Sequence, residues 1–546
     1  MYYPSQDDLR LLRQHNKTIY VNIEVKNKSL DTLDEISGVC TDFSYSISSD
    51  SGVRQTANVS IYIKDNKYKV RQDSLFWLDK ILYVQVGYAD NILNETHYYP
   101  NGYYLITDNG YSYSESDKIL SLTLVDLMSL FDGERGGYLT GQKIAVYRYG
   151  NHPLDWYTAF NENNEPYECD ENGNKTSNNT IRPNTIRQVV IDIVSDWGKW
   201  KNYKIGDVGD YYGGVYESYE IPYDLEFGSG STIFDVLDKL RNLYPNWEFF
   251  FDEDGYFVYQ KIPTGIDDPI IFDDTILKGL IISEPSSNSF SDICNLREVF
   301  GLCFTPDYAS NTTAVSQGDT YNVTMSYSNF AYENNKLYAF IAGTTNVANV
   351  KLNINNLGAW PIVKEKNLNG NYIEIDAYSL VPNTAYVVKC DKVDKNTWQF
   401  IYQGQYQVWA IDSVWSQEPS DATKQQYIKD FGCQNMSFTV FPTNPFCVDK
   451  IGLVVGSTIV DEQIYTDQLA LERAQFENYN STILKDTVTM DLIAIPWIGV
   501  NQKLEHTLRL TGIKSQYLIK SVDMNVLSGT MSLTMTYFYN YYPYRK

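Results

Sequence analysis

The stretch FFFDEDGYFVYQ, residues 249–260, fits two local structures that lead to different folds. In an EF-hand, Gly255 would stand at position 6, which puts Phe250 at position 1 and Lys261 at position 12. Neither residue supplies the carboxylate that calcium requires there. In a β-hairpin, the aromatic residues alternate along two strands and Asp254-Gly255 forms the turn, because glycine adopts positive φ at no steric cost. We therefore expect a hairpin.

Two helices are expected before this hairpin. The nearer one has Thr232 and Asp235 at capping-box spacing, with Asp in place of the usual Glu or Gln. This helix ends at 244–246, after its apolar stripe. The apolar residues of each of the two helices recur with a period of 3.6 residues. Their members are Ile186, Val189, Val190, Ile193, Val194 and Trp197 in the first helix, and Ile233, Val236, Leu237, Leu240 and Leu243 in the second. Helices plus hairpin predict a small α+β domain over residues 185–303.

The N-terminal residues 1–150 alternate like strands, which predicts a β-sandwich or barrel. A short helix is expected over 125–131. The polar stretch 161–184, within a linker at 151–184, reads as a loop. In that stretch Glu168, Asp170, Asn172 and Gly173 resemble part of a calcium loop, but Asn179 would stand at position 12, so we expect a surface loop. The expected strands are 19–26, 42–49, 58–64, 81–88, 103–108 and 118–124.

The second half of the chain has two parts. Residues 304–412 are rich in Asn, Thr, Ser, Val and Tyr, and we expect an inserted β-module there. Residues 413–546 contain a helix at 465–479 with Thr466 as its N-cap. Leu469 and Phe476 of this helix could pack within their own domain or between subunits. Strands are expected at 487–495, 504–510, 517–526 and 529–539. No internal repeat at a solenoid or propeller period is apparent.

Composition excludes several classes of protein. The chain has 546 residues and a net charge of −24, which argues against binding a phosphate backbone or an anionic membrane over a broad surface. Its 47 tyrosines favour strands and half-wet interfaces. Seven cysteines without a CxxC motif predict neither a disulfide framework nor a zinc site. Cysteines without a disulfide pattern indicate synthesis in a reducing cytoplasm. No apolar segment suits a signal peptide or a membrane span.

No catalytic constellation emerges from the sequence. The four histidines, His15, His97, His152 and His506, form no HExxH motif, and neither a GxSxG elbow nor a complete P-loop occurs. With 68 acidic residues, carboxylates close in sequence carry little information about a glycosidase pair. We predict no catalytic, cofactor or metal site. Trp360 and Trp398 of the insert are the candidates for stacking on sugars.

Four stretches, in this order, carry a resemblance to a known family. They are SGVCTDFSYSISSDSGVRQTANVSIYI (37–63), NGYYLITDNGYSYSESDKILSLTLVDLMSLFDGERGG (101–137), the helix and hairpin at 233–263 with 273–284, and the C-terminal segments 464–507 and 517–526 with the tail YYP (541–543). In this order they resemble baseplate-hub (tail-tip hub) proteins of tailed bacteriophages and prophages, including the N-terminal hub region of siphophage tail-associated lysins. The insert resembles small β-modules of tail fibres and tip proteins.

The resemblance implies a mainly β, multidomain protein with tube-like hub domains that forms a homotrimer at the distal end of the tail tube. Two β-domains per subunit would match a six-fold ring with three copies. Its partners would be the tube or distal tail protein, the tape-measure protein and a tip, spike or fibre protein. The resemblance places the chain in the virion, with genome DNA passing through unbound. Since no lysin domain follows before Lys546, we expect no wall-degrading activity.

Three functions stay open from the sequence. The first is the structural hub, for which an acidic lumen would repel DNA phosphates and let the genome slide. The second is a receptor-binding tail protein whose insert, 304–412, binds host-surface carbohydrate. The third is a polysaccharide-degrading tail enzyme, which would require a close pair of carboxylates in a cleft.

Overall fold

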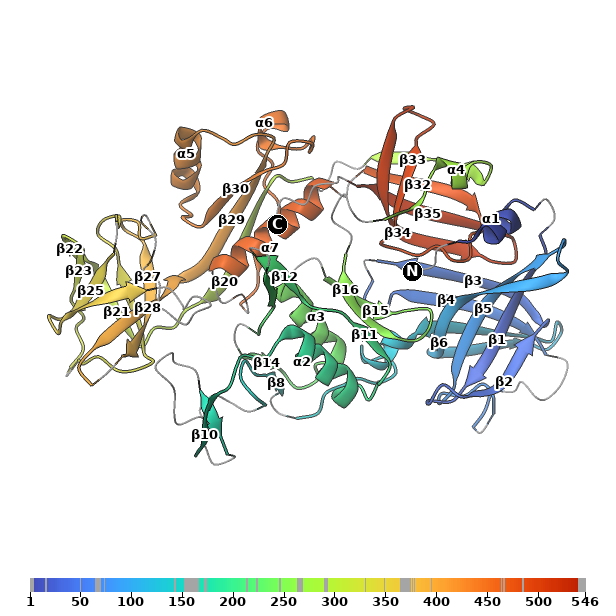
Figure 1. Cartoon of the computed structure of the whole chain (residues 1–546), viewed down its shortest axis with the longest axis horizontal. Helices are drawn as coiled ribbons and strands as arrows, with labels where there is room; N and C mark the ends of the chain where they lie inside the picture. The colour runs from blue at the N-terminus through green and yellow to red at the C-terminus, as the bar shows by residue number, and fades with distance from the viewer. Residues whose placement is uncertain are drawn as a thin grey trace.

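The computed structural model consists of several β-sheets arranged side by side in an elongated molecule (Figure 1). It describes residues 4–538 except 15–16, 50, 64–69, 73, 142–143, 152–165, 171–173, 213–214, 222–223, 245–246, 263–268, 289–292, 329, 348, 364–374, 376, 378, 394, 463, 465–466 and 484–485. The expectation of a mainly β protein with α+β parts is confirmed. Among the described residues, no helix has both the length and the apolar character needed to cross a bilayer.

The largest sheet has fourteen strands and combines both ends of the chain. Alternating residues of its strands point into one core, which includes Phe43, Tyr104, Phe272, Leu504 and Val522. The N-terminal strands are β1 (Ile19–Lys26), β2 (Thr32–Ser37), β3 (Cys40–Ser48), β4 (Gln55–Tyr62), β5 (Ile81–Asp90), β6 (Glu95–Ser114) and β7 (Ile119–Asp126). The later strands are β17 (Ile270–Phe272), β18 (Ile281–Ser283), β19 (Ser286–Asn288), β32 (Asp486–Ile493), β33 (Lys503–Thr507), β34 (Lys514–Asn525) and β35 (Thr530–Tyr537).

The expected helix at 125–131 is wrong in extent. Strand β7 continues to Asp126, and only a single 3₁₀ turn, η2 (Leu127–Leu130), follows. The side chain of Asp126 caps this turn by accepting a hydrogen bond from the backbone N–H of Met128, so the chain changes from strand to turn at that residue. A helix that the sequence analysis did not predict, α1 (Gln6–Leu12), begins at a capping box of Ser5 and Asp8.

The expected helices and hairpin of the middle part are confirmed. The first helix is α2 (Ile186–Asp192), which continues as a π-turn, η4 (Ile193–Trp197), and the second is α3 (Ile233–Leu243) with its capping box complete. The hairpin consists of β15 (Trp247–Phe251) and β16 (Phe257–Lys261), and Gly255 has φ 78° in the turn. Short strands complete this part: β8 (Ile144–Val146) with β14 (Leu225–Phe227), β12 (Gly209–Tyr212) with β13 (Val215–Ser218), and β11 (Tyr203–Ile205) beside β16.

The polar stretch 161–184 is not a plain loop. It contains a two-stranded sheet of β9 (Tyr167–Cys169) and β10 (Lys175–Thr180), whose turn starts with the Asp170 carboxylate accepting from the backbone of Asn174. Residues 161–165 and 171–173 lie outside the described residues, as do His15, His152, Thr466 and the tail 541–543.

The inserted module is an eight-stranded sheet with its own core. Its strands, in sheet order, are β21 (Tyr308–Thr313), β24 (Leu337–Ile341), β27 (Ala385–Lys392), β28 (Trp398–Gln405), β26 (Ala359–Val363), β25 (Lys351–Ile354), β23 (Thr320–Val323) and β22 (Val315–Gln317).

A four-stranded sheet connects the insert to the rest of the chain. It consists of β30 (Met436–Val440), β29 (Gln407–Trp415), β20 (Leu296–Cys303) and β31 (Ile459–Val460). The helices of the later chain are α4 (Asp274–Leu277), α5 (Asp421–Phe431), α6 (Val448–Ile451) and α7 (Asp467–Ile483), which packs on this sheet. The predicted domain division stays a prediction, and the β20–β29 pairing joins residues on both sides of its boundaries at 303 and 412.

Candidate assembly surface

The fourteen-stranded sheet contains one strand pattern twice. The first repeat runs β3-β4-β7-β6-β5, and the second runs β18/β19-β32-β35-β34-β33. In each repeat the fourth strand is long: β6 pairs with β5 and then with β7, and β34 pairs with β33 and then with β35. The two halves of the sheet are therefore built to the same plan.

Local details of the two repeats coincide. The turn between β6 and β7 has four residues, 115–118, and ends at Lys118 with φ 55°. The turn between β34 and β35 also has four residues, 526–529, and ends at Gly529 with φ 69°. This alignment makes Ser114 equivalent to Asn525.

A bulge also recurs at the same place. In β3, Cys40 and Asp42 pair with adjacent residues of β4, so the residue between them bulges out. In β18, Ile281 and Ser283 pair with adjacent residues of β32 in the same way. A shared turn and a shared bulge, at matched positions, establish a structural repeat that the sequence analysis did not find.

The repeats join edge to edge within the chain. Strand β3 of the first repeat pairs antiparallel with β34 of the second, from Ser44 opposite Asn525 to Ser48 opposite Ser521. In Figure 1 this junction is where the blue N-terminal strands meet the red C-terminal strands. The core continues across it, so the two repeats form one sheet with a single core.

One face of this joined sheet is polar along β3, β4, β7, β32, β35 and the C-terminal end of β34, where the positions that point away from the core carry acidic but no basic side chains. On β33 and the N-terminal end of β34, the same face carries Lys503 and Lys514. The polar positions are Asp42, Ser44, Ser46, Thr56, Asn58, Ser60, Ser121, Thr123, Thr489, Asp491, Asp523, Asn525, Thr530, Ser532 and Thr534. The apolar Ile119 and Ile493 lie at the ends of strands on the same face. Hydroxyls bond across the strands, for example Ser60 with Ser121 at 2.9 Å between oxygens. A hollow of about 590 Å³ lies over the β3–β34 junction. We call this the polar face; its charge disfavours phosphate contact.

A buried ionic cluster connects the hairpin to both ends of the chain. Arg54 Nη1 lies 3.0 Å from Glu248 Oε2, and the two side chains are 11% and 9% exposed. The Arg54 guanidinium also lies 3.8 Å from the centre of the Phe250 ring. Asn501 donates to Glu248 Oε2 at 2.5 Å, and Gln260 donates to its Oε1 at 2.8 Å. We call these five residues the clasp.

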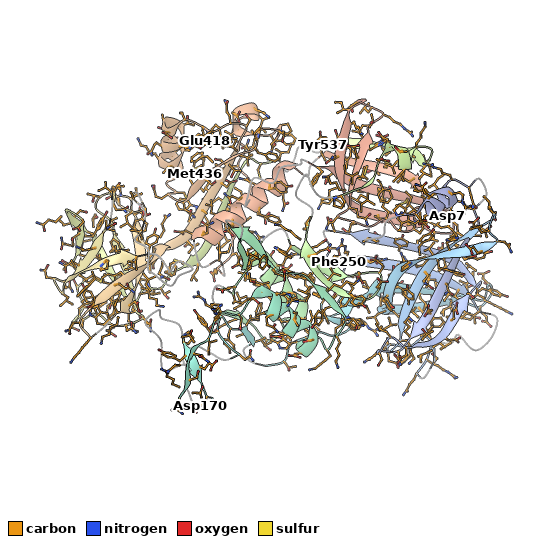
Figure 2. All side chains as sticks on the ribbon, viewed as in Figure 1. Asp7, Asp170, Phe250, Glu418, Met436 and Tyr537 are labelled. Carbon is orange, nitrogen blue, oxygen red and sulfur yellow. The ribbon has the colours of Figure 1, made fainter. Side chains whose placement is uncertain are left out.

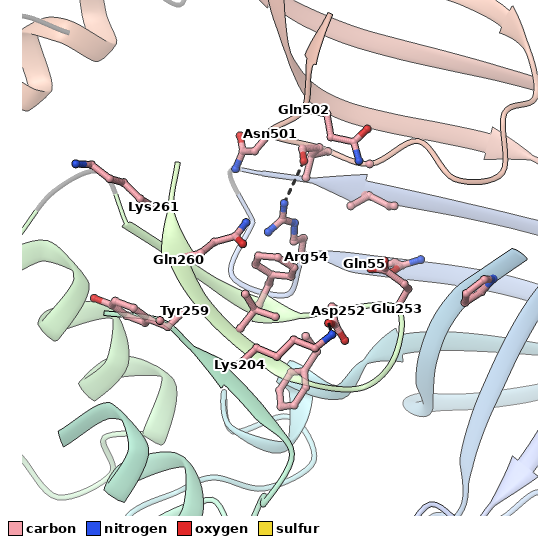
Figure 3. Close-up of a pocket in the computed structure, with 18 of the residues that line it drawn as sticks. Arg54, Gln55, Lys204, Asp252, Glu253, Tyr259, Gln260, Lys261, Asn501 and Gln502 are labelled. Atoms are coloured by element: carbon pink, nitrogen blue, oxygen red, sulfur yellow. Dashed lines mark hydrogen bonds and ion pairs between the residues drawn. The ribbon is translucent and has the colours of Figure 1, made fainter. Parts of the chain in front are cut away.

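The clasp lies on the wall of a cavity of about 980 Å³ between the hairpin, the β3–β4 segment and residues 496–502. Figure 2 shows Phe250 where the middle part of the molecule faces the large sheet, and Figure 3 shows Arg54 between the hairpin and the segment with Asn501 and Gln502. Because a charged pair is held by donors from three separate segments, the clasp fixes how these segments meet.

Two buried carboxyl groups have raised pKa values. Burial raises the pKa of Asp126 to about 7, although the backbone N–H groups of Gln55 and Met128 donate to it. Burial also raises the pKa of Asp467, at the start of α7, to about 7. Both groups stabilise local backbone through hydrogen bonds, and neither lies beside a nucleophile or base in the contacts described.

The histidine of the C-terminal sheet bridges two carboxylates. His506 Nδ1 lies 2.6 Å from Asp274 Oδ1, and its Nε2 lies 3.3 Å from Glu284 Oε2. This bridge holds the segment from α4 to β18 against β33. Within the described ranges, no group of three His, Cys, Asp or Glu side chains is arranged to hold a metal ion.

Trp360 and Trp398 lie on neighbouring parallel strands of the insert. Trp360 lies two residues before Ile362, and Trp398 lies two residues before Phe400, which pairs with Ile362. Because residues two apart on a strand share a face, both tryptophans lie on the face that holds the core. Both are half-buried and pack against that core, and Lys392 Nζ lies 5.5 Å from the Trp398 ring centre. A contact with sugar stays a prediction for these two residues.

Helix α7 presents small residues to the four-stranded sheet. Ala470 and Ala474 are fully buried, Leu469 is half-buried against the same core, and Asn478 donates to the backbone of Asp412 at 2.7 Å. Leu469 packs within its own chain, and a role of Leu469 or Phe476 between subunits stays a prediction.

The chain is similar over nearly its whole length to phage and prophage tail proteins. A 43 kDa tail protein of prophage MuSo2 from Shewanella oneidensis is 10% identical, with a TM-score of 0.41, covering 94% of this chain and 98% of that one. A tail protein from Neisseria meningitidis MC58 is 8% identical, with a TM-score of 0.43 and coverages of 95% and 96%. Prophage tail protein gp18 from Listeria monocytogenes EGD-e is 8% identical, with a TM-score of 0.41 and coverages of 94% for both chains.

Two comparisons of sequence complete this picture. Residues 443–542 match a family described as a domain of unknown function, DUF5048. No curated protein matches the chain.

Proposed function

We propose that this chain is a structural virion protein, the trimeric hub of a phage baseplate or tail tip, and that it has no enzymatic activity. The observation that carries the proposal is the structural repeat: one chain supplies two copies of a half-sheet, joined edge to edge by β3 and β34. A protein that contacts a six-fold tube through three copies needs two equivalent units in each copy. The order of segments that resembles hub proteins agrees with this arrangement.

The polar face suits the wall of a channel for DNA. Its side chains are small and hydroxylated, and its charged members, Asp42, Asp491 and Asp523, are acidic. Carboxylates repel the phosphate backbone, and the absence of Lys and Arg from these positions removes the usual phosphate contacts. DNA would slide along such a wall instead of binding to it.

The remaining sheets serve assembly. The clasp sets the middle part against both repeats, so the hub would keep its shape under load from a tape-measure protein on one side and a tip or spike on the other. The insert projects at the far end of the molecule from the large sheet (Figure 1), where it can meet fibre proteins or a host surface.

The experiment is to raise an antibody against the whole chain and label purified particles of a phage that encodes it. The proposal expects label at the distal end of the tail and particles without a baseplate when the gene is disrupted. Label on the capsid, or tails that assemble fully without the protein, would contradict it. Hydrolysis of purified host wall by the protein would contradict the non-enzymatic part.

A further inference from the structure

Two strands of the joined sheet, β6 and β18/β19, have an open edge. In the part of the chain that the structure describes, β6 beyond Tyr104 pairs with β7 and has no strand on its other side. At the opposite end, β18 and β19 pair with β32 alone. Open edges expose unpaired N–H and C=O groups, which favour pairing with another strand.

These two edges are the equivalents of the strands already joined inside the chain. In the repeat, β6 corresponds to β34, and β18/β19 corresponds to β3. We infer that the open edge of β6 in one copy pairs antiparallel with β18/β19 of the next copy, repeating the β3–β34 junction head to tail. The inference rests on the proposed hub function and names the strands that close its ring.

The internal junction gives the register. Tyr45 lies opposite Ala57, and Ser286 lies opposite Val488. Since the bulges align Ile61 with Leu492, Ala57 corresponds to Val488 and Tyr45 to Ser286. With Ser114 equivalent to Asn525, the expected pairs between copies are Tyr113 with Ser286, Ser112 with Ser287 and Tyr111 with Asn288.

Burial of side chains differs between the joined edge and the open edge. Tyr111 and Tyr113 are 52% and 50% exposed on β6, whereas their equivalents on β34, Val522 and Met524, are 0% and 3% exposed. The internal junction covers its apolar residues, and the open edge leaves two tyrosines uncovered. Tyrosine suits a surface that is wet before assembly and packed after it.

Pro285, between β18 and β19, does not block this edge. Its equivalent is Ser44, and Thr489 N–H donates to the Pro285 carbonyl at 3.1 Å, so this residue's backbone faces β32. In an antiparallel ladder, neighbouring residues bond to opposite sides. The missing N–H of proline therefore falls on the inner side, and Ser286 and Asn288 keep their N–H groups for the outer side.

The bond pattern selects a pair for crosslinking. Val526 N–H donates to Phe43 C=O and Ser49 N–H donates to Lys520 C=O, both at 2.9 Å. Bonded pairs alternate from these positions, so Ser46 and Asp523 form a pair without mutual hydrogen bonds, as do their equivalents Ser287 and Ser112. Cα atoms in such pairs lie about 4.5 Å apart, which a disulfide can span.

The experiment uses the full chain with Ser112→Cys and Ser287→Cys, and with Cys303→Ser to remove an exposed natural thiol. It is oxidised at about 100 µM and run on a denaturing gel beside light scattering of the same sample. The inference expects linked dimers and trimers. The matched controls are each single cysteine variant and the pair Ser112→Cys with Asn288→Cys, which the expected register offsets by one residue. They should link at least tenfold less.

The outcomes separate the pairing from the hub function. Trimers in solution without these links contradict the edge pairing and leave the hub standing. A ladder that continues beyond three chains supports the pairing and contradicts the trimer. A monomer without links, or equal linking in the controls, contradicts the pairing.

A second variant tests the same edge without cysteines. Tyr113→Pro removes an N–H that faces the next copy and leaves the β6–β7 ladder, whose bonds come from Ser112 and Ser114. We expect at least a tenfold weaker self-association than for Tyr113→Ala, at unchanged protection of β7 amides in hydrogen exchange. Equal association of the two variants would overturn the inference.

Discussion

Removing one member of the clasp should loosen the contact between the hairpin and the large sheet. In Arg54→Met, Glu248 stays buried and loses its countercharge. Breaking a buried pair in this way typically destabilises a protein by about 3–5 kcal/mol. Asn501 and Gln260 still donate to Glu248, which favours the lower end, and losing the contact with Phe250 adds roughly 0.5–1 kcal/mol. We therefore expect a loss of about 3–4 kcal/mol in the free energy of local opening.

The assay must read the local event, because a chain with several sheets does not unfold in two states. Hydrogen exchange of the β15–β16 amides, with fluorescence of Trp247 and Trp497 in urea, reports on the cavity wall that contains the clasp. A double-mutant cycle with Glu248→Gln isolates the pair, and the coupling should be on the order of 2 kcal/mol.

The matched control for the clasp is Lys204→Met. Lys204 Nζ lies 2.7 Å from Asp252 on the rim of the same cavity, but its side chain is half-exposed, so the loss should be below about 1 kcal/mol. If Arg54→Met costs no more than Lys204→Met, or if the cycle gives no coupling, the clasp does not hold the hairpin in place.

Three further predictions follow from single sites. Gly255→Ala should destabilise the hairpin by about 1–3 kcal/mol because φ is 78° and the new Cβ would lie 3.1 Å from the Tyr103 ring. The control Gly512→Ala, with φ 68° and open space around the new Cβ, should cost less. Equal losses of stability for the two variants by urea denaturation would rule out the Tyr103 contact. Asp467 has a pKa of about 7 when folded and near 3.8 when unfolded, so its contribution favours folding below pH 4 and is lost as pH rises to 7. Asp467→Asn should reduce the pH dependence of the free energy of local opening, read by hydrogen exchange of the α7 amides between pH 5 and 7, by up to about 1 kcal/mol per pH unit. An unchanged pH dependence would refute this. If Trp398 binds sugar, Trp398→Ala should weaken glycan-array binding by the whole chain roughly tenfold with β27 amide protection unchanged; loss of both would assign Trp398 to packing alone.

Local rules account for the parts that the sequence predicted. The hairpin at 247–261 and helix α3 depend on a turn glycine, a capping box and an apolar stripe, all within about fifteen residues. The late start of the helix expected at 125–131 also has a local cause, the Asp126 side chain, which caps the turn after β7 stops.

The features that matter most for assembly depend on residues far apart in the sequence, so local sequence patterns could not predict them. Pairing of Ser44 with Asn525 joins residues from opposite ends of the chain, and alternation along a strand does not name its partner. The repeat is preserved in bulges and turn lengths, whereas its residues differ: Glu115-Ser116-Asp117-Lys118 in one turn corresponds to Val526-Leu527-Ser528-Gly529 in the other. The clasp likewise combines Arg54, Glu248 and Asn501, which only the folded chain brings together.

The most direct test of the central claim is a cryo-electron microscopy map of the tail of a particle that contains this protein. The account predicts three copies around the tube axis at the distal end, with six half-sheets in a closed ring and the polar face toward the channel. A map that places the protein in a peripheral fibre, or with its polar face turned outward, would contradict it.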